Sequence, residues 1–190
     1  MQEIAEKFGC SSNKVAYWMA RYSIPRRSIS DAVYQKANSQ GDPFTFILPK
    51  TKDEAILFGL GIGLFWGEGT KASKTSVRLG NTDPYLIEKF VFFLETFFSI
   101  KRESLKFGLQ IFSDLSEVAA LKFWTERLGV QKTQFYKTII TPYRSIGNYR
   151  KKSEWGVVTI YFNNVKMRNI LIDMIEQQKG GSLVVPKKPL

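Results

Sequence analysis

The chain has 190 residues, of which 44% are hydrophobic and 14% aromatic, so it is long and apolar enough to form a folded domain. Its 28 lysines and arginines against 17 acidic residues give a net charge of +11, which is typical of proteins that bind a polyanion, most often nucleic acid. The absence of histidine and the single cysteine exclude Ser-His-Asp triads, histidine metal sites, zinc clusters and intrachain disulfides.

Carboxylates, lysines, tyrosines or a hard metal ion must therefore carry any chemistry. Residues 1–20 lack the apolar stretch of a signal peptide. The longest apolar run, residues 55–66, is shorter than the roughly 20 residues that a membrane-spanning helix needs. We therefore expect a soluble, cytoplasmic protein.

Residues 1–37 predict a helix-turn-helix, with helices over 2–8 and 12–22. Ala5, Gly9 and Val15 supply its small contact residue, its left-handed turn and the β-branched residue under the second helix. We expect an apolar underside formed by Ile4, Phe8, Val15 and Trp18. A plain helical hairpin packed on the main domain is the alternative. The side chains expected to contact DNA from this segment are Asn13, Lys14, Arg26 and Arg27.

Residues 38–50 are predicted to be a linker, part of which docks through its phenylalanines and aliphatic residues. Residues 51–179 alternate between helix and strand and form the main domain, and residues 180–190 are an expected flexible tail. The predicted elements of the main domain are a helix over 53–67, a hairpin over 70–81, a helix over 83–98, a strand over 105–111, a helix over 116–128 ended by Gly129, strands over 133–140 and 155–162, and a helix over 165–177.

The helix over 53–67 contains four glycines, each of which costs about 1 kcal/mol relative to alanine inside a helix. Gly59, Gly63 and Gly67 are four residues apart and share one face. A face without side chains lets another helix approach closely. Because the motif occurs once, the partner is expected to be the same helix of a second chain.

Glu68 follows the last of these glycines, and Gly69 ends the helix. A two-fold axis along the interface would bring two copies of Glu68 together, and paired carboxylates either share a proton or bind a divalent cation. Beside a basic surface, Mg²⁺ is the favoured outcome because it binds phosphate oxygens and activates water. A solvated glutamate at the helix end is the alternative.

The segment LFGLGIGLFWGEG resembles the LAGLIDADG motif of homing endonucleases, with Gly63 and Gly67 at its small positions, Glu68 at its catalytic acid and Gly69 at its last glycine. The resemblance covers about residues 52–178. It implies an α+β fold with an αββαββα-like core, a saddle-shaped antiparallel sheet in the DNA major groove and homodimers on near-palindromic sites. It also implies Mg²⁺ at Glu68 and Gly67. Trp66 and Gly61 depart from the motif, and the helix over 116–128 interrupts the usual strand pairing.

If the apolar residues of the predicted strands pack on the helices, their alternates face the DNA. The expected DNA contacts of the main domain are Lys71, Ser73, Lys74, Ser76, Arg78, Lys106 and Gln110, together with Arg144, Arg150, Lys151 and Lys152 in a basic loop that follows phosphates. A solvated charged loop is the alternative for the last four. Lys106 or Lys137 could polarise the attacking water, and the sequence does not select between them.

The sequence thus leads to two hypotheses. One is a homodimeric, Mg²⁺-dependent, site-specific endonuclease that acts on double-stranded DNA. The other is a DNA-binding transcriptional regulator on the same fold that does not cleave.

Overall fold

The computed structural model describes all residues except 27, 144–152 and 180–190. The chain divides into two compact units, Met1–Pro43 and Phe44 onward, so the boundary falls within the predicted linker. Residues 44–47 dock on the second unit, as predicted. Phe44 is buried, and the amides of Thr45 and Ile47 donate to the carbonyl oxygens of Phe98 and Phe97 at 3.0 and 2.8 Å. The predicted tail over 180–190 lies outside the described residues.

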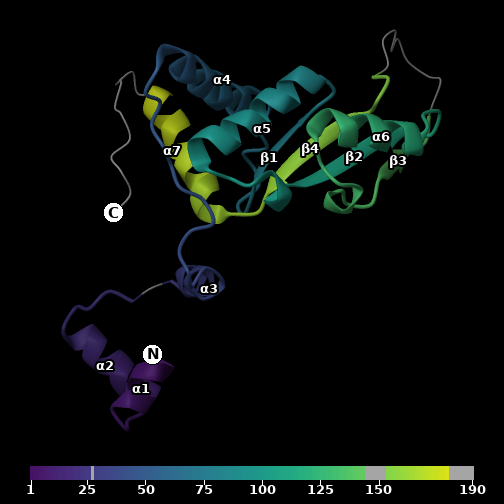
Figure 1. The fold of residues 1–190 in the computed structure, drawn as a ribbon. Coiled ribbons are helices and arrows are strands. Elements are labelled where there is room, and N and C mark those ends of the chain that lie inside the picture. The colour runs from purple at the N-terminus through teal and green to yellow at the C-terminus, as the bar shows by residue number, and fades with distance from the viewer. Residues whose placement is uncertain (27, 144–152, 180–190) are drawn as a thin grey trace. The chain divides into compact units, whose positions relative to one another are not determined.

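The first unit contains the helices α1 (Gln2–Lys7), α2 (Ser12–Arg21) and α3 (Ile29–Ala37) (Figure 1). Gly9 has the left-handed φ of +57° that the turn between α1 and α2 requires. The Ser11 side chain caps α2 by accepting from the Lys14 amide at 3.3 Å. Ala5 and Val15 are buried between the two helices. The two helices, the turn at Gly9 and the burial of Ala5 and Val15 are therefore as the sequence indicates.

Four helices of the second unit begin and end where the sequence indicates. They are α4 (Lys52–Glu68), α5 (Pro84–Phe98), α6 (Glu117–Leu128) and α7 (Val165–Lys179). Thr51 and Glu54 form a capping box at the start of α4. Asp83 caps α5 ahead of its first-turn proline. Gly129 ends α6 in the left-handed conformation, at a φ of +61°. None of the described helices is long and apolar enough to span a membrane.

The sheet contains β1 (Val77–Asn81), β2 (Lys106–Phe112), β3 (Ile139–Thr141) and β4 (Val157–Phe162) in the order β1-β4-β2-β3. β4 pairs antiparallel with both β1 and β2, but β3 runs parallel to β2. The expectation of an antiparallel sheet was therefore wrong at this edge. The cause is α6, which connects β2 to β3 as a crossover and returns the chain in the same direction. The protein is thus an α+β protein with a mixed sheet.

Two predicted strands are shorter than expected. In the predicted hairpin over 70–81, the first arm is reduced to a bridge between Gly69 and Leu79 and a hydrogen bond from the Thr70 amide to the Arg78 carbonyl at 2.9 Å. In the predicted strand over 133–140, residues 132–134 form the 3₁₀ helix η2 (Lys132–Gln134). Phe135 makes an isolated bridge to Phe107, and the strand itself is reduced to 139–141.

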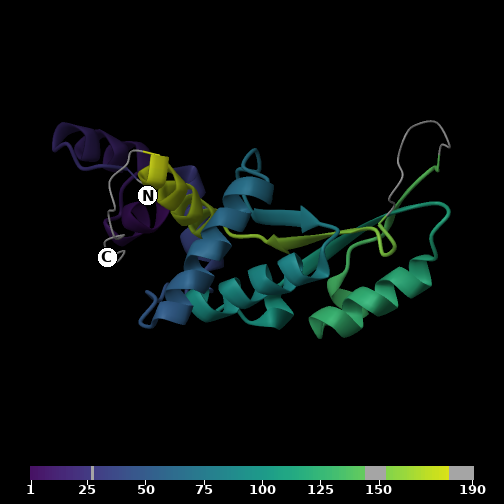
Figure 2. The same cartoon turned by 90° about the horizontal axis from the view of Figure 1, so that it is seen from above.

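The core lies between one face of the sheet and the helices. Figure 2 shows α5 and α6 on the same side of the sheet. Phe90, Phe93 and Phe97 of α5 are almost fully buried, and the Phe93 ring lies 5.6 Å from that of Phe90 and 5.8 Å from that of Phe97. The strand residues that face this cluster are all buried: Val77, Leu79, Phe107, Leu109, Ile111, Val158, Ile160 and Phe162. The predicted alternation of the strands is therefore confirmed.

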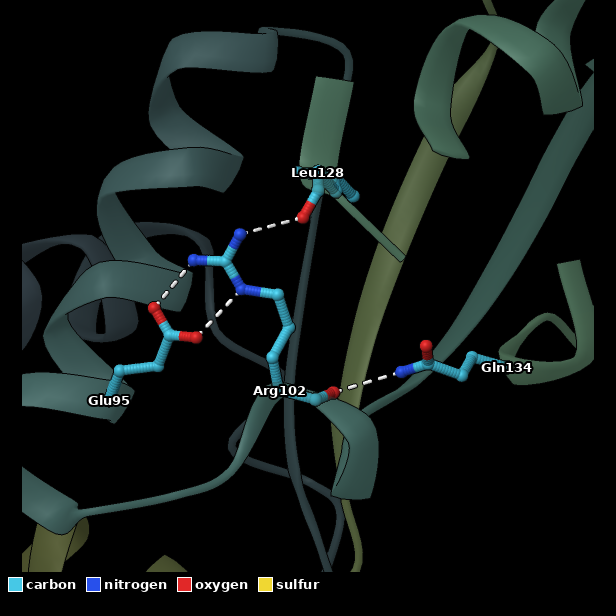
Figure 3. A network of polar contacts seen from close by, with 4 residues as sticks. All are labelled: Glu95, Arg102, Leu128 and Gln134. Atoms are coloured by element: carbon cyan, nitrogen blue, oxygen red, sulfur yellow. Dashed lines mark hydrogen bonds and ion pairs between the residues drawn. The ribbon is translucent and has the colours of Figure 1, made fainter. Parts of the chain in front are cut away.

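Arg102 links α5, α6 and η2 through hydrogen bonds (Figure 3). Its Nε and Nη2 donate to the Glu95 carboxylate at 2.7 and 2.6 Å, and its Nη1 donates to the carbonyl oxygen of Leu128 at 2.8 Å. Its own carbonyl accepts from Gln134 Nε2 at 2.9 Å. The hydrogen bond with Glu95 raises the pKa of Arg102, against the lowering effect of burial. Arg102 therefore fixes the ends of α5 and α6 and the position of η2.

Candidate nucleic-acid interface

The outward face of α4 is apolar and nearly flat. A β-carbon added at Gly59, Gly63 or Gly67 would have no described atom within 4 Å. Three large side chains on the same helix are exposed, with Ile56 at 60% and Leu60 and Trp66 at 43% each. The glycines that were predicted to form a dimer interface therefore lie on a face that the described part of the chain leaves open.

Gly61 has a different role from the other three glycines. It is buried, and a β-carbon there would overlap the ring of Phe93 on α5. The glycine at this position allows α4 and α5 to pack closely within one chain. The sequence alone does not separate these roles, because it shows only that Gly61 lies off the face shared by the other three.

Glu68 is the last residue of α4, and its side chain is exposed. Its carboxylate makes no hydrogen bond or ion pair with another described residue. Lys71 Nζ donates to the carbonyl oxygen of Trp66 at 2.6 Å and so places a cation at the same helix end. The described residues contain no group of three or more acidic or cysteine side chains that could hold a metal ion.

The free carboxylate of Glu68 and the backbone carbonyl of Gly67 are hard oxygen donors of the kind that Mg²⁺ prefers. They fit one half of a cation site, and a second carboxylate would have to come from a second copy of α4.

The face of the sheet that points away from α5 and α6 is polar. The strand pairing aligns Arg78 of β1, Tyr161 of β4 and Lys106 of β2 in one row across this face. The next row consists of Gly80, Thr159 and Gly108. Two of these three residues lack a side chain, and the side chains of Thr159 and Tyr161 occupy the space beside Gly80 and Gly108. We call this surface, which also includes Gln110, the open face of the sheet.

Tyr161 occupies the centre of the first row. The Arg78 guanidinium lies over its ring at 5.3 Å, and the ring of Tyr136 meets it edge-on at a centroid distance of 5.3 Å. Sequence reasoning missed both tyrosines as candidate site residues. The alternation of residues 155–162 was sufficient to find Tyr161. Tyr136 is placed by the bridge between Phe135 and Phe107 and by its amide, which donates to the Phe107 carbonyl oxygen at 2.8 Å.

Ser76 lies on the same side of the chain as Arg78 but is covered, so it is not available as the DNA contact that the sequence predicted. It is fully buried, and its Oγ accepts from Arg78 Nε at 2.7 Å. Its hydroxyl also pairs with that of Ser73 at 2.8 Å. The polar side chain is buried there because the turn over 71–75 folds back over the start of β1.

Arg168 of α7 anchors that turn. Its Nε donates to the carbonyl oxygen of Ser73 at 2.9 Å, and its Nη2 donates to the carbonyl oxygen of Lys71 at 2.8 Å. The sequence does not single out Arg168, because nothing in the local pattern shows a contact across more than 90 residues.

The remaining predicted contacts of the second unit are placed as follows. Lys74 is exposed in the turn after α4. Lys106 Nζ lies 3.4 Å from the carbonyl oxygen of Thr133, and Gln110 Nε2 lies 3.3 Å from the Thr141 hydroxyl. Lys137 is exposed. The predicted phosphate-contacting residues Arg144, Arg150, Lys151 and Lys152 lie outside the described residues.

In the first unit, Asn13, Lys14 and Arg26 are exposed, as a DNA contact requires, and Arg27 lies outside the described residues. The predicted apolar underside is only partly correct. Val15 is buried, but Ile4, Phe8 and Trp18 are 44%, 73% and 44% exposed. They line an open groove of about 480 Å³ because α1 and α2 alone form a single layer, which cannot cover both of its sides. The other residues of the groove are Cys10, Lys14, Met19, Tyr22 and Ile24.

Comparisons of the chain with models of protein families, with curated proteins and with solved structures found no match.

Proposed function

We propose that the protein is a site-specific endonuclease for double-stranded DNA, which acts as a homodimer with Mg²⁺ held at Glu68. The observation that carries this proposal is the outward face of α4. Three glycines and three exposed apolar side chains follow one side of this helix, and the face ends at an exposed carboxylate without a described partner.

The dimer in this proposal forms by packing two copies of α4 against each other. Gly59, Gly63 and Gly67 permit close approach of the two backbones, and Ile56, Leu60 and Trp66 supply apolar area. A two-fold contact of this kind is self-complementary, because each helix presents the same residues to the other. With the two-fold axis running along the helices, it would also place the two copies of Glu68 at the same end of the interface.

The cation would be held by Glu68 and the Gly67 carbonyl of each chain. When bound, it would supply Lewis-acid stabilisation of phosphate charge and an activated water. Glu68 would position the cation at the phosphate, and Lys71, held at the end of α4 by the Trp66 carbonyl, would offset the negative charge that gathers there.

DNA would lie on the open face of the sheet. Arg78, Lys106 and Gln110 are suited to hydrogen bonds with base edges, while the exposed Lys74 would contact phosphates. Asn13, Lys14 and Arg26 of the first unit would extend the contact along the DNA.

A regulator that binds DNA without cleaving it is the second candidate. It is favoured by a specific observation, because Glu68 is not part of any acidic group among the described residues. Binding through the sheet and the helical hairpin would not need a cation.

The two candidates are separated by incubating a library of duplexes with the protein and Mg²⁺, and by comparing the wild type with Glu68→Gln. We expect the wild type to cut both strands and Glu68→Gln to bind without cutting. Glu126→Gln, an exposed glutamate on α6, is the matched control and should cut normally. Cutting by Glu68→Gln would refute the role of this residue. Binding without cutting by the wild type would favour the regulator, and absence of binding would refute both.

A further inference from the structure

Two residues hold the guanidinium of Arg78: Ser76, just before β1, and Tyr161 of β4. Its Nε donates to Ser76 Oγ at 2.7 Å, and its Cζ lies 5.3 Å from the centre of the Tyr161 ring. Its Nη1 and Nη2 make no hydrogen bond with another described residue. The planar end of the side chain, with two nitrogen donors, is therefore available on the open face, while the rest is fixed.

Ser76 is itself fixed, so it can act as a rigid support. Its side chain is fully buried and its hydroxyl pairs with that of Ser73 at 2.8 Å. Ser73 in turn is tied to α7, because Arg168 Nε donates to its carbonyl oxygen at 2.9 Å. A continuous polar chain therefore runs from α7 through the turn to the guanidinium of Arg78.

We propose that Arg78 specifies a guanine in the DNA target, and that Ser76 is the positioning residue that orients it. This inference rests on the proposed binding of duplex DNA. A guanine presents two acceptors, O6 and N7, in the plane of the base on its major-groove edge, and two parallel N–H donors of an arginine match them. Because the Nε–H of Arg78 already donates to Ser76, Nη1 and Nη2 would donate to the O6 and N7 atoms of the guanine.

The fixed orientation favours a base over a phosphate as the ligand. A phosphate can be contacted from many directions, so a mobile lysine serves as well, and Lys74 is exposed in the neighbouring turn. A base edge accepts hydrogen bonds in one plane only. Ordering a free arginine side chain costs entropy, and the contacts with Ser76 and Tyr161 remove most of that cost before DNA binds.

The test measures sequence preference and salt dependence of binding for four single variants and one double variant of the full chain. A duplex library with a randomised core is first selected with the wild type to define a preferred site. Arg78→Lys keeps the charge and removes the planar pair of donors. Ser76→Ala removes the acceptor, and Ser76→Cys weakens it while preserving volume. Ser104→Ala, an exposed serine distant from Arg78 in the sequence, is the matched control.

We expect Arg78→Lys to lose about 5- to 150-fold of the preference for guanine at one position, with the salt dependence of binding unchanged. The two Ser76 variants should lose preference at the same position, by about fivefold, which is the value of one hydrogen bond. In the Arg78→Lys background, Ser76→Ala should have no further effect on preference, because the serine acts through the arginine. Ser104→Ala should bind as the wild type does.

Thermal unfolding of each variant is measured in parallel. If both Ser76 variants unfold, Arg78→Lys still decides the guanine assignment, because Arg78 is a half-buried surface side chain. Unchanged sequence preference in Arg78→Lys would overturn the inference and leave the proposed function standing. Loss of preference at a different position in the folded Ser76 variants would overturn the role of Ser76. Absence of duplex binding by the wild type would overturn the inference together with the proposed function.

Discussion

Gly61 and Phe93 are in direct contact where α4 crosses α5, and the aromatic ring fills the space that a side chain at Gly61 would need. Phe93 is fully buried and is also stacked with Phe90. This contact sets the distance between the two helices. It also turns the other three glycines of α4 outward, because they lie on a different side of the helix.

We expect Gly61→Ala to destabilise the protein by about 1 to 3 kcal/mol, because the added methyl group overpacks a filled core. The gain in helix propensity, about 1 kcal/mol, does not offset a clash with a buried ring. Unfolding in denaturant measures the change. Phe93→Leu in the same chain should relieve the overlap, so the double variant should be more stable than the sum of the single effects predicts. Additive effects would show that the two residues are not in contact.

Gly63→Leu should convert the proposed dimer to monomers without unfolding the chain. A leucine at this position meets open space within one chain but would separate two helices packed through their backbones. Sedimentation measures the mass. Ala119→Leu, at an exposed alanine on α6, is the control and should leave the mass unchanged. An unaltered dimer in Gly63→Leu would place the interface elsewhere.

Arg102→Ala should lower the free energy of unfolding by about 2 kcal/mol. The variant removes two hydrogen bonds to Glu95 and one to the Leu128 carbonyl, and the partial exposure of this pair limits the value of each charged contact. Lys122→Ala provides the comparison, because its pair with Glu126 is 3.9 Å long and exposed, and we expect a loss below about 0.5 kcal/mol. Equal losses of unfolding free energy in the two variants would show that Arg102 does not stabilise the contact between α5, α6 and η2.

Lys74→Ala should weaken DNA binding equally for all sequences and reduce the slope of affinity against salt by about one. The reason is that a phosphate contact releases counterions but does not read bases. Lys89→Ala, on the exposed side of α5, should change neither quantity. Binding titrations at several salt concentrations give both values. A change in sequence preference with an unchanged slope would mean that Lys74 contacts a base.

The elements of this protein could be predicted where the local pattern is strong. Ser11, Thr51 and Asp83 cap the helices that follow them, and Gly9 and Gly129 adopt the left-handed turns expected of them, because capping and turn formation depend on neighbouring residues. The alternation of apolar residues with polar residues and glycine in β2 also indicated which of its side chains are buried. The strand over 133–140 was not predictable in the same way, because the 3₁₀ turn over 132–134 is held by distant hydrogen bonds from Gln134 to the carbonyl oxygens of Arg102 and Leu105.

The sequence by itself determined that Gly59, Gly63 and Gly67 share a face of α4 and that Glu68 ends it, since helical periodicity follows from spacing alone. Only the tertiary structure decided that the other described residues of the same unit leave this face uncovered, whereas Gly61 packs on Phe93. It also decided that Ser76 is buried beneath Arg78. The two tyrosines, Tyr136 and Tyr161, meet on the open face of the sheet, and Arg168 anchors the turn that precedes β1. These contacts join residues far apart in the chain, and their geometry depends on how the sheet and helices pack together.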